Sequence, residues 1–272
     1  MSEAEEYAKT PRSTVNRYKP RAVYDHATVH SIIDEAPVAH VSFNPTPLDD
    51  DPFPTILPML ACTGSYTKPG AEEKSAVGIY LHGHVASRLM RLPDTQSEDQ
   101  STLGLPGAPV CVAATLFDGV VLALTPFNHS CNYRSAVVHG FANIVVDEEE
   151  KSYALKLLTD NLVPGRWDNS RVPPTEAELK GTTVLRVDIA SASAKIRGYA
   201  AGNDKADLAN DEMRKRVWTG VVPAATVFGQ PIAAAENLVV EVPEYIHSWI
   251  DGGNKARRAY SEVVASKAGP QK

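Results

Sequence analysis

The stretch IYLHGHVASRLMRL, residues 79–92, carries the first candidate site. Apolar residues lead into His82, Gly83 opens a turn, and Ser87 and Arg88 precede a run with helical spacing. The first turn of a helix has unpaired N–H groups and a partial positive charge, which favour a phosphate group. A serine hydroxyl and an arginine guanidinium add hydrogen bonds to the same anion. The stretch predicts a phosphate site, and the alternative is a solvated helix start with surface arginines.

Short segments that alternate between apolar and polar residues surround this stretch and predict strands. Asp25 and Asp147 stand where helix N-caps are expected, and Thr175 opens a third, short helix. Pro58 predicts an edge position or a bulge, and Asp118-Gly119 predicts a hairpin turn. The expected strands are 38–43, 55–63, 76–82, 110–116, 120–126, 137–146, 183–191 with a continuation over 194–198, and 239–242. The longer expected helices are 28–36, 85–92, 147–159 and one near the C-terminus.

The order of these segments predicts the fold class. Most expected strands follow one another directly, without the regular alternation of strand and helix that a doubly wound sheet requires. We therefore expect a mainly β fold, an antiparallel barrel with packed helices. Residues 1–24 are expected to form an N-terminal arm, 25–223 the barrel domain, and 224–272 an extension that covers the barrel or a partner subunit.

The composition restricts the classes of partner. The chain has 272 residues and a formal net charge of −6, which argues against nucleic acid and anionic membranes as partners. It has no apolar run long enough to span a bilayer and no apolar leader, so we expect a cytoplasmic protein. Cys62, Cys111 and Cys131 match no metal-binding spacing, so we expect free thiols and no metal site.

Four elements, in this order, resemble the pyridoxamine 5′-phosphate oxidase-like split barrels, in particular their nitroimidazole-resistance-type, flavin-nucleotide-binding branch. They are the strand and Ser-Arg turn of 79–88, NYRSAVVHGFANIVVDEEEKSYALKLL of 132–158, SAKIRG of 193–198 and WTGVVP of 218–223. The resemblance implies a split β-barrel with Greek-key-like, antiparallel strands. It also implies a homodimer that holds FMN at the subunit interface.

The resemblance assigns roles to individual residues. The backbone of Pro58, Met59, Leu60 and Ala61 would line the isoalloxazine edge, and Leu81, His82, Gly83 and His84 would run beside the phosphate and ribityl chain. Ser87 and Arg88 would hold the phosphate, Tyr133 and Arg134 would come from the partner subunit, and Trp218 would pack near the ring. Lys195, which shares a strand face with Arg197, is a candidate for an anion clamp or a solvated edge.

One departure from the family pattern concerns charge. Oxidases of this superfamily often place a lysine directly after the Ser-Arg pair, where this chain has Leu89. A second positive charge must then come from elsewhere. Arg91 and Arg134 are the candidates, and we expect Arg134 of the partner subunit to supply it.

These features predict an FMN-binding oxidoreductase in which NADH or NADPH reduces the flavin and a small organic molecule accepts the electrons. No GxGxxG fingerprint is present, so the nicotinamide would bind transiently. The alternatives are a non-catalytic flavin-binding protein and a haem-binding split barrel. His82 is the candidate catalytic residue, with phosphate or substrate bonding, packing, and haem or metal ligation as open roles.

Overall fold

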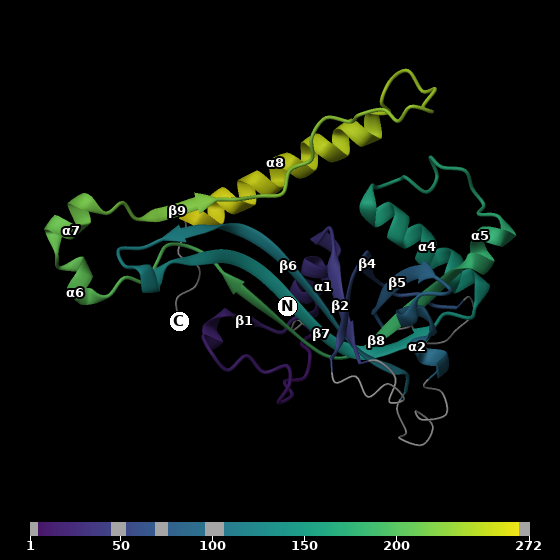
Figure 1. Cartoon of the computed structure of the whole chain (residues 1–272), viewed down its shortest axis with the longest axis horizontal. Coiled ribbons are helices and arrows are strands. Elements are labelled where there is room, and N and C mark those ends of the chain that lie inside the picture. Colours follow the sequence, from purple (N-terminus) through teal and green to yellow (C-terminus); the bar gives the residue numbers. More distant parts are fainter. Residues whose placement is uncertain (1–4, 45–52, 69–75, 96–105, 267–272) are drawn as a thin grey trace. The chain divides into compact units, whose positions relative to one another are not determined.

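The computed structural model describes residues 5–44, 53–68, 76–95 and 106–266, and its elements are labelled in Figure 1. The strands are β1 (Ala22–Val23), β2 (Ala39–Phe43), β3 (Thr55–Met59), β4 (Ala61–Gly64), β5 (Gly78–His84), β6 (Ala108–Leu122), β7 (Ser130–Ile144), β8 (Thr182–Arg197) and β9 (Gly220–Pro223). The helices are α1 (His26–Glu35), α2 (Arg88–Thr95), α4 (Glu148–Leu162), α5 (Glu176–Gly181), α6 (Lys205–Leu208), α7 (Asp211–Arg216) and α8 (Glu244–Ser266), with short 3₁₀ turns at Lys19–Arg21 and Pro126–Asn128.

The strands form one mainly antiparallel, unclosed sheet in the order β3-β2-β6-β7-β8-β5-β4, with β1 paired to β8 and β9 paired to β6. This arrangement confirms the predicted fold class. The chain divides into two compact units, which are described separately. The first comprises 1–17, 23–115 and 135–194, and the second comprises 18–22, 116–134 and 195–272. The division into arm, barrel and extension drawn from the sequence stays a prediction.

Two helices of the first unit, α1 and α4, are capped where the sequence predicts, whereas α2 begins at Arg88 and not at Val85. The side chain of Asp25 accepts a hydrogen bond from the Thr28 N–H at 2.8 Å and caps α1. Asp147 accepts from the N–H groups of Glu149 and Glu150 and caps α4. The inner face of α4 packs on a buried cluster that includes Tyr80 and contributes to the core of this unit. Apolar side chains at helical spacing therefore fix both helices against the sheet.

Pro58 lies in an edge strand, as expected for a residue without a backbone N–H. β3 stands at one end of the strand order, and the expected strand 55–63 is interrupted at Leu60, which separates β3 from β4. Ala61 of β4 pairs with Leu81 of β5, so the break passes the chain from one end of the sheet to the other. A proline is tolerated at such an edge because no central ladder hydrogen bond is lost.

The hairpin expected at Asp118-Gly119 is wrong, because β6 continues through both residues. The Asp118 side chain is buried and accepts hydrogen bonds from Arg134 of β7, from Nε at 3.2 Å and from Nη2 at 3.1 Å. Gly119 pairs with Pro223 of β9 and has a φ of 155°. A dipeptide with strong turn propensity thus remains in a strand because a buried ion pair satisfies its carboxylate.

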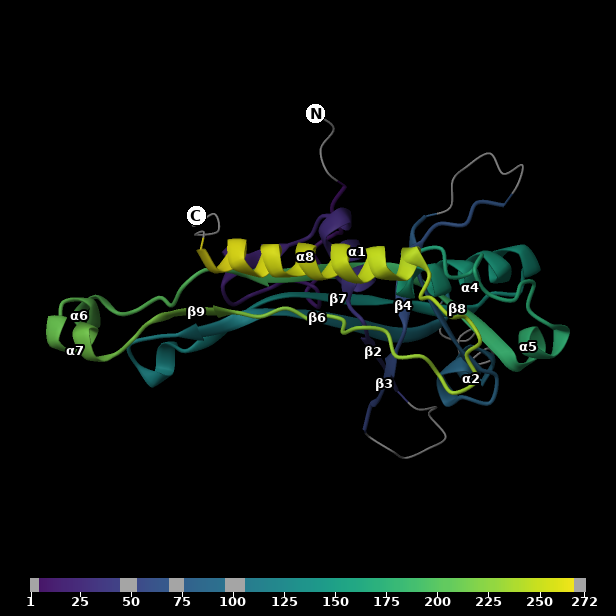
Figure 2. The ribbon, with the colours of Figure 1, turned by 90° about the horizontal axis from the view of Figure 1, so that it is seen from above.

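In the second unit, α8 runs alongside β9 (Figures 1 and 2). The Tyr199 N–H donates to the Val264 carbonyl at 2.8 Å, which ties the end of this helix to the residues after β8. The strand expected at 239–242 is absent, since these residues have no ladder partner among the described residues. Leu238 and Val240 are almost fully exposed, so this segment buries too little apolar surface to enter a sheet.

Among the described residues, no helix has both the length and the apolar character needed to cross a membrane.

Candidate functional site

The turn that joins β5 to α2 is the candidate phosphate site. The Ser87 N–H donates to the His84 carbonyl at 2.8 Å, and the Arg91 N–H donates to the Ser87 carbonyl at 3.2 Å. The second bond is the first helical one, so Ser87 stands at the N-cap of α2. The His84 ring Nδ1 accepts from the Ala86 N–H at 3.1 Å and fixes the turn. The N–H groups of the first helical turn lie C-terminal to Ser87, as a phosphate site requires.

The charge at this turn comes from two arginines on one face of α2. Arg88 and Arg91 are exposed and stand three positions apart, so they are neighbours on the helix surface. Leu89, Met90 and Leu92 are buried and anchor the opposite face. Leu89, which replaces the expected lysine, is therefore a core residue. Arg91 stands where it can add the second positive charge to the same anion.

His82 differs from every other residue of the turn because it is partly buried without a polar partner. Its Nδ1 has no hydrogen-bond partner among the described residues. Burial lowers the pKa of the His82 ring below its usual value. A neutral imidazole with an unsatisfied buried nitrogen fits a ligand that supplies a hydrogen bond or a coordination bond at this position.

A pocket of about 810 Å³ adjoins this turn in the first unit. Val85 of the turn lines it, together with Val184, the register partner of His82. Leu155 and Trp167 add apolar walls. The Lys151 ammonium also lines the pocket and donates to the Leu179 carbonyl at 2.7 Å, which fixes the start of α4 against α5. The pocket therefore has a mixed lining, with apolar walls beside several polar and charged side chains.

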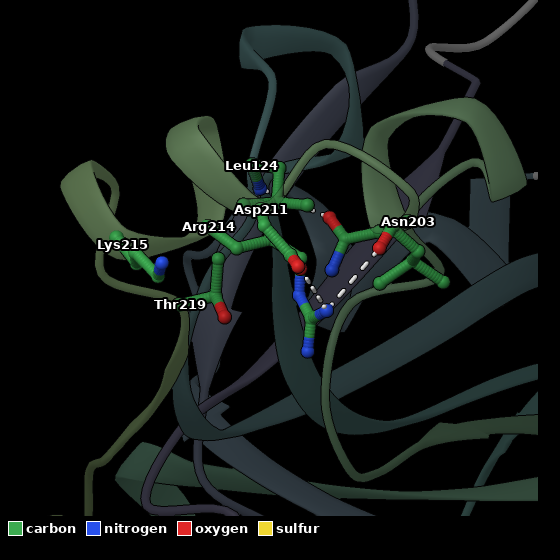
Figure 3. A pocket seen from close by; sticks show the side chains of 7 residues that line it. Leu124, Asn203, Asp211, Arg214, Lys215 and Thr219 are labelled. Atoms are coloured by element: carbon green, nitrogen blue, oxygen red, sulfur yellow. Dashed lines mark hydrogen bonds and ion pairs between the residues drawn. The ribbon is translucent and has the colours of Figure 1, made fainter.

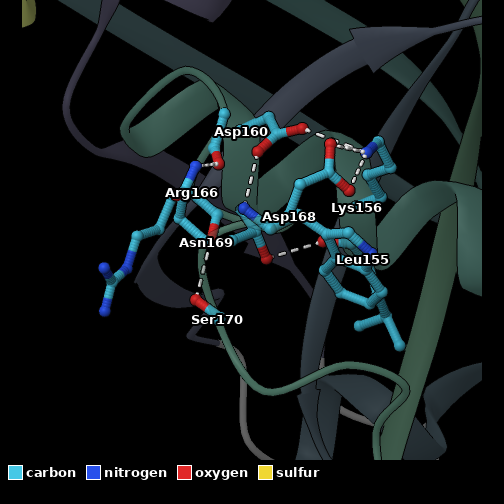
Figure 4. A network of polar contacts seen from close by, with 10 residues as sticks. Leu155, Lys156, Asp160, Arg166, Asp168, Asn169 and Ser170 are labelled. Carbon is cyan, nitrogen blue, oxygen red and sulfur yellow. Dashed lines mark hydrogen bonds and ion pairs between the residues drawn. The ribbon is translucent and has the colours of Figure 1, made fainter. Parts of the chain in front are cut away.

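A polar network holds the loop that follows α4 (Figure 4). Trp167 of this loop lines the pocket. The Lys156 ammonium donates to both carboxylate oxygens of Asp168 at 2.7 Å, and Asp160 accepts from the Trp167 N–H at 2.8 Å. α4 thereby fixes the loop that follows it. Sequence reasoning missed Trp167, and the only local signal was an aromatic residue in a polar loop.

The structure brings ten of the predicted cofactor residues together around β4 and β5. Pro58–Ala61 pass from β3 into β4, which pairs with Leu81–His84 of β5, and Ser87 and Arg88 follow directly. The other four, Tyr133, Arg134, Lys195 and Trp218, belong to the second unit.

Tyr133 of the second unit is half-buried, and the other three residues have distinct surroundings. Arg134 pairs with buried Asp118, and its guanidinium carbon lies 3.9 Å from the ring centre of Tyr260 in α8. These contacts hold the guanidinium inside the unit, and its assignment to the flavin phosphate stays a prediction. Lys195 lies 6.0 Å from the ring centre of Tyr18. Trp218 is 66% exposed, which leaves its ring accessible.

A second pocket, of about 450 Å³, lies in the second unit beside α6 and α7 (Figure 3). Asn203 accepts from the Leu124 N–H at 2.9 Å, and Arg214 pairs with Asp211 at 3.0 Å. The arginine is therefore already neutralised by a carboxylate, and the pocket adds no residue suited to redox chemistry.

Comparison with known proteins places these features in context. The model of a family described as pyridoxamine 5′-phosphate oxidase matches residues 25–196. The structure of the flavocytochrome Anf3 from Azotobacter vinelandii is similar, with 30% identity, a TM-score of 0.66, and coverage of 88% of this chain and 96% of that one. A FAD and haem binding protein from Mycobacterium smegmatis has 25% identity and a TM-score of 0.64, with coverage of 84% and 96%. No curated protein matches the chain.

Proposed function

Because the chain belongs to the pyridoxamine 5′-phosphate oxidase family, we propose that it is a flavoprotein that holds the phosphate of a flavin nucleotide at the Ser87–Arg88 turn. The observation that carries this proposal is the start of α2, where unpaired N–H groups, a serine hydroxyl and two exposed arginines meet. Charge-assisted bonds from this set suit a phosphate dianion.

The second positive charge is assigned to Arg91. It stands three residues after Arg88 on the exposed face of α2, whereas Arg134 already pairs with Asp118. This assignment needs no residue from a partner subunit. The homodimer that the family resemblance implies remains part of the proposal, with Tyr133 and Trp218 as residues that would contact the flavin ring.

The chemistry proposed is electron transfer from NADH or NADPH to a small organic acceptor. The bound flavin would supply the redox step, and the chain's residues would orient the cofactor and exclude water. Burial keeps His82 uncharged near neutral pH, so its ring is suited to accept or donate one hydrogen bond near the flavin. The apolar walls of the pocket beside the turn would receive the planar part of the acceptor or donor.

Haem is the second candidate cofactor, alongside the flavin. One similar structure is named a flavocytochrome, and the other is named a FAD and haem binding protein. Each covers more of the chain than the family model does, so the likeness reaches into residues outside 25–196. The unpartnered His82 Nδ1 would be available to ligate a haem iron. FAD then becomes as strong a candidate as FMN.

The absorption spectrum of the protein as purified tests this proposal. A flavin band alone supports the flavoprotein, and a Soret band in addition supports the flavocytochrome. Mass spectrometry of the released cofactor distinguishes FMN from FAD. Bleaching of the flavin band by NADH or NADPH under nitrogen would support the reductase activity. Failure of the protein to bind FMN, FAD or haem on reconstitution would refute the proposal.

A further inference from the structure

Three cationic side chains of the second unit gather around one tyrosine. The guanidinium carbon of Arg21 lies 4.2 Å from the ring centre of Tyr18, and the Lys195 ammonium lies 6.0 Å from the same point. Arg197 is close enough to Arg21 and Tyr18 for both to act on its charge. Tyr18 also has a left-handed backbone, with a φ of 56°, which is costly for a residue with a side chain.

Arg197 is the buried member of this cluster, with 6% of its surface exposed. Its guanidinium donates to the Asn132 side-chain oxygen, to the Tyr199 carbonyl at 3.3 Å and to the Ala200 carbonyl at 3.2 Å. All three acceptors are neutral. Burial and the nearby Arg21 lower its pKa. Its positive charge is therefore incompletely compensated within the described residues.

A second observation points to a missing ligand at the same place. Asn132 is fully buried, and its Nδ2 has no hydrogen-bond partner among the described residues although its Oδ1 accepts from Arg197. A buried amide N–H₂ that lacks an acceptor is costly. An acceptor that also carries negative charge would satisfy Asn132 and offset the repulsion between Arg21 and Arg197.

We propose that the second unit contains a separate anion site, in which Arg21, Lys195, Arg197 and the Asn132 amide bind a phosphate or carboxylate group of a small ligand beside the Tyr18 ring. The proposal uses residues of the second unit only. It therefore does not depend on the assignment of the flavin phosphate to Ser87 and Arg88. A guanidinium that stacks on an aromatic ring is a usual element of phosphate and carboxylate sites.

Cys131 provides a local reporter of this site. It is exposed, and its thiol acts on the charge of Arg197. Iodoacetate is an anion and iodoacetamide is neutral, while both alkylate the thiolate. The ratio of the iodoacetate rate to the iodoacetamide rate at Cys131, measured by peptide mapping, therefore reports the local electrostatic potential. A change in the thiol pKa affects both rates equally and leaves this ratio unchanged. We expect Arg21→Gln to lower this ratio by about two- to fivefold. Lys180→Gln, a matched loss of one charge in the first unit, should leave it unchanged.

Ligand protection completes the test. Pyrophosphate and succinate serve as phosphate and carboxylate probes on the purified protein. We expect at least one of them to slow alkylation of Cys131 by neutral iodoacetamide, and the effective probe identifies the ligand class. Arg21→Gln and Lys195→Gln should each weaken this protection, whereas Arg88→Ala should not. Absence of protection by both anions would overturn the proposal, as would protection that depends on Arg88 instead of Arg21.

Discussion

At the scale of single residues, His82 makes a titratable contribution to stability. Its pKa is lowered by burial in the folded protein, so the unfolded chain binds a proton more readily. The stability that this group contributes is complete above its unfolded pKa and is lost as the pH falls toward the lowered folded value. We expect the free energy of unfolding to fall as the pH drops below the unfolded histidine pKa of about 6.5. His82→Gln should flatten part of this dependence in urea titrations.

His30 is a second histidine that contributes to the pH dependence of stability. The pKa of His30 is also lowered by burial, and its Nε2 lies 2.6 Å from the Tyr7 hydroxyl. Removal of His82 should therefore leave a residual pH dependence that His30→Gln reduces further. A His82→Gln profile parallel to that of the wild type would contradict the assignment.

Single residues also show how far sequence reasoning extends. The caps Asp25 and Asp147 were predictable because capping is local and needs only a few adjacent residues. The roles of Asp118 and Arg197 were not, because their partners lie 16 and 65 residues away along the chain. Buried charge networks depend on strand register, which the sequence pattern does not specify residue by residue.

At the scale of elements, the Asp118–Arg134 pair joins β6 to β7 below α8. Both side chains are largely buried, with 5% and 13% of their surfaces exposed. Asp118→Asn leaves a buried guanidinium without its counterion, so we expect a loss of about 3–5 kcal/mol in the free energy of unfolding. The matched change Asp211→Asn removes an exposed pair with Arg214 and should cost about 0–1 kcal/mol.

Chemical denaturation of the two variants measures both losses in the free energy of unfolding. Equal costs for Asp118→Asn and Asp211→Asn would show that the buried pair does not stabilise this part of the sheet.

The contact between β7 and β8 depends on Gly140. A Cβ atom at this position would clash with the Asp188 carbonyl oxygen and with a Val187 methyl group. Since a backbone oxygen cannot rotate away, Gly140→Ala should cost roughly 1–3 kcal/mol. Gly229→Ala is the matched control, because a Cβ atom added there would have no other atom within 4 Å. Thermal melting should give a clearly lower midpoint for Gly140→Ala than for Gly229→Ala. Identical midpoints would contradict the close approach of β7 to β8.

At the scale of the whole molecule, the fold class and the family were predictable because many short alternating segments and four ordered motifs agreed. The two-unit organisation was not, because three long strands, β6, β7 and β8, each contribute residues to both units. The sequence pattern predicts two strands in place of β6, with a turn between them at Asp118-Gly119. Ten of the candidate cofactor residues lie together in the first unit, and the other four belong to the second unit.

The central claim is that the Ser87–Arg88 turn holds the phosphate of a flavin. The most direct test measures, by flavin fluorescence, how tightly the cofactor-free protein binds FMN and riboflavin, which lacks the phosphate. The proteins compared are the wild type, Arg88→Ala and the control Arg171→Ala. We expect Arg88→Ala to weaken FMN binding by about tenfold to a hundredfold, the loss of one charge-assisted bond. Riboflavin binding should be unchanged in every protein. Equal affinity of the wild type and Arg88→Ala for FMN would contradict the assignment, as would an equal loss for FMN and riboflavin.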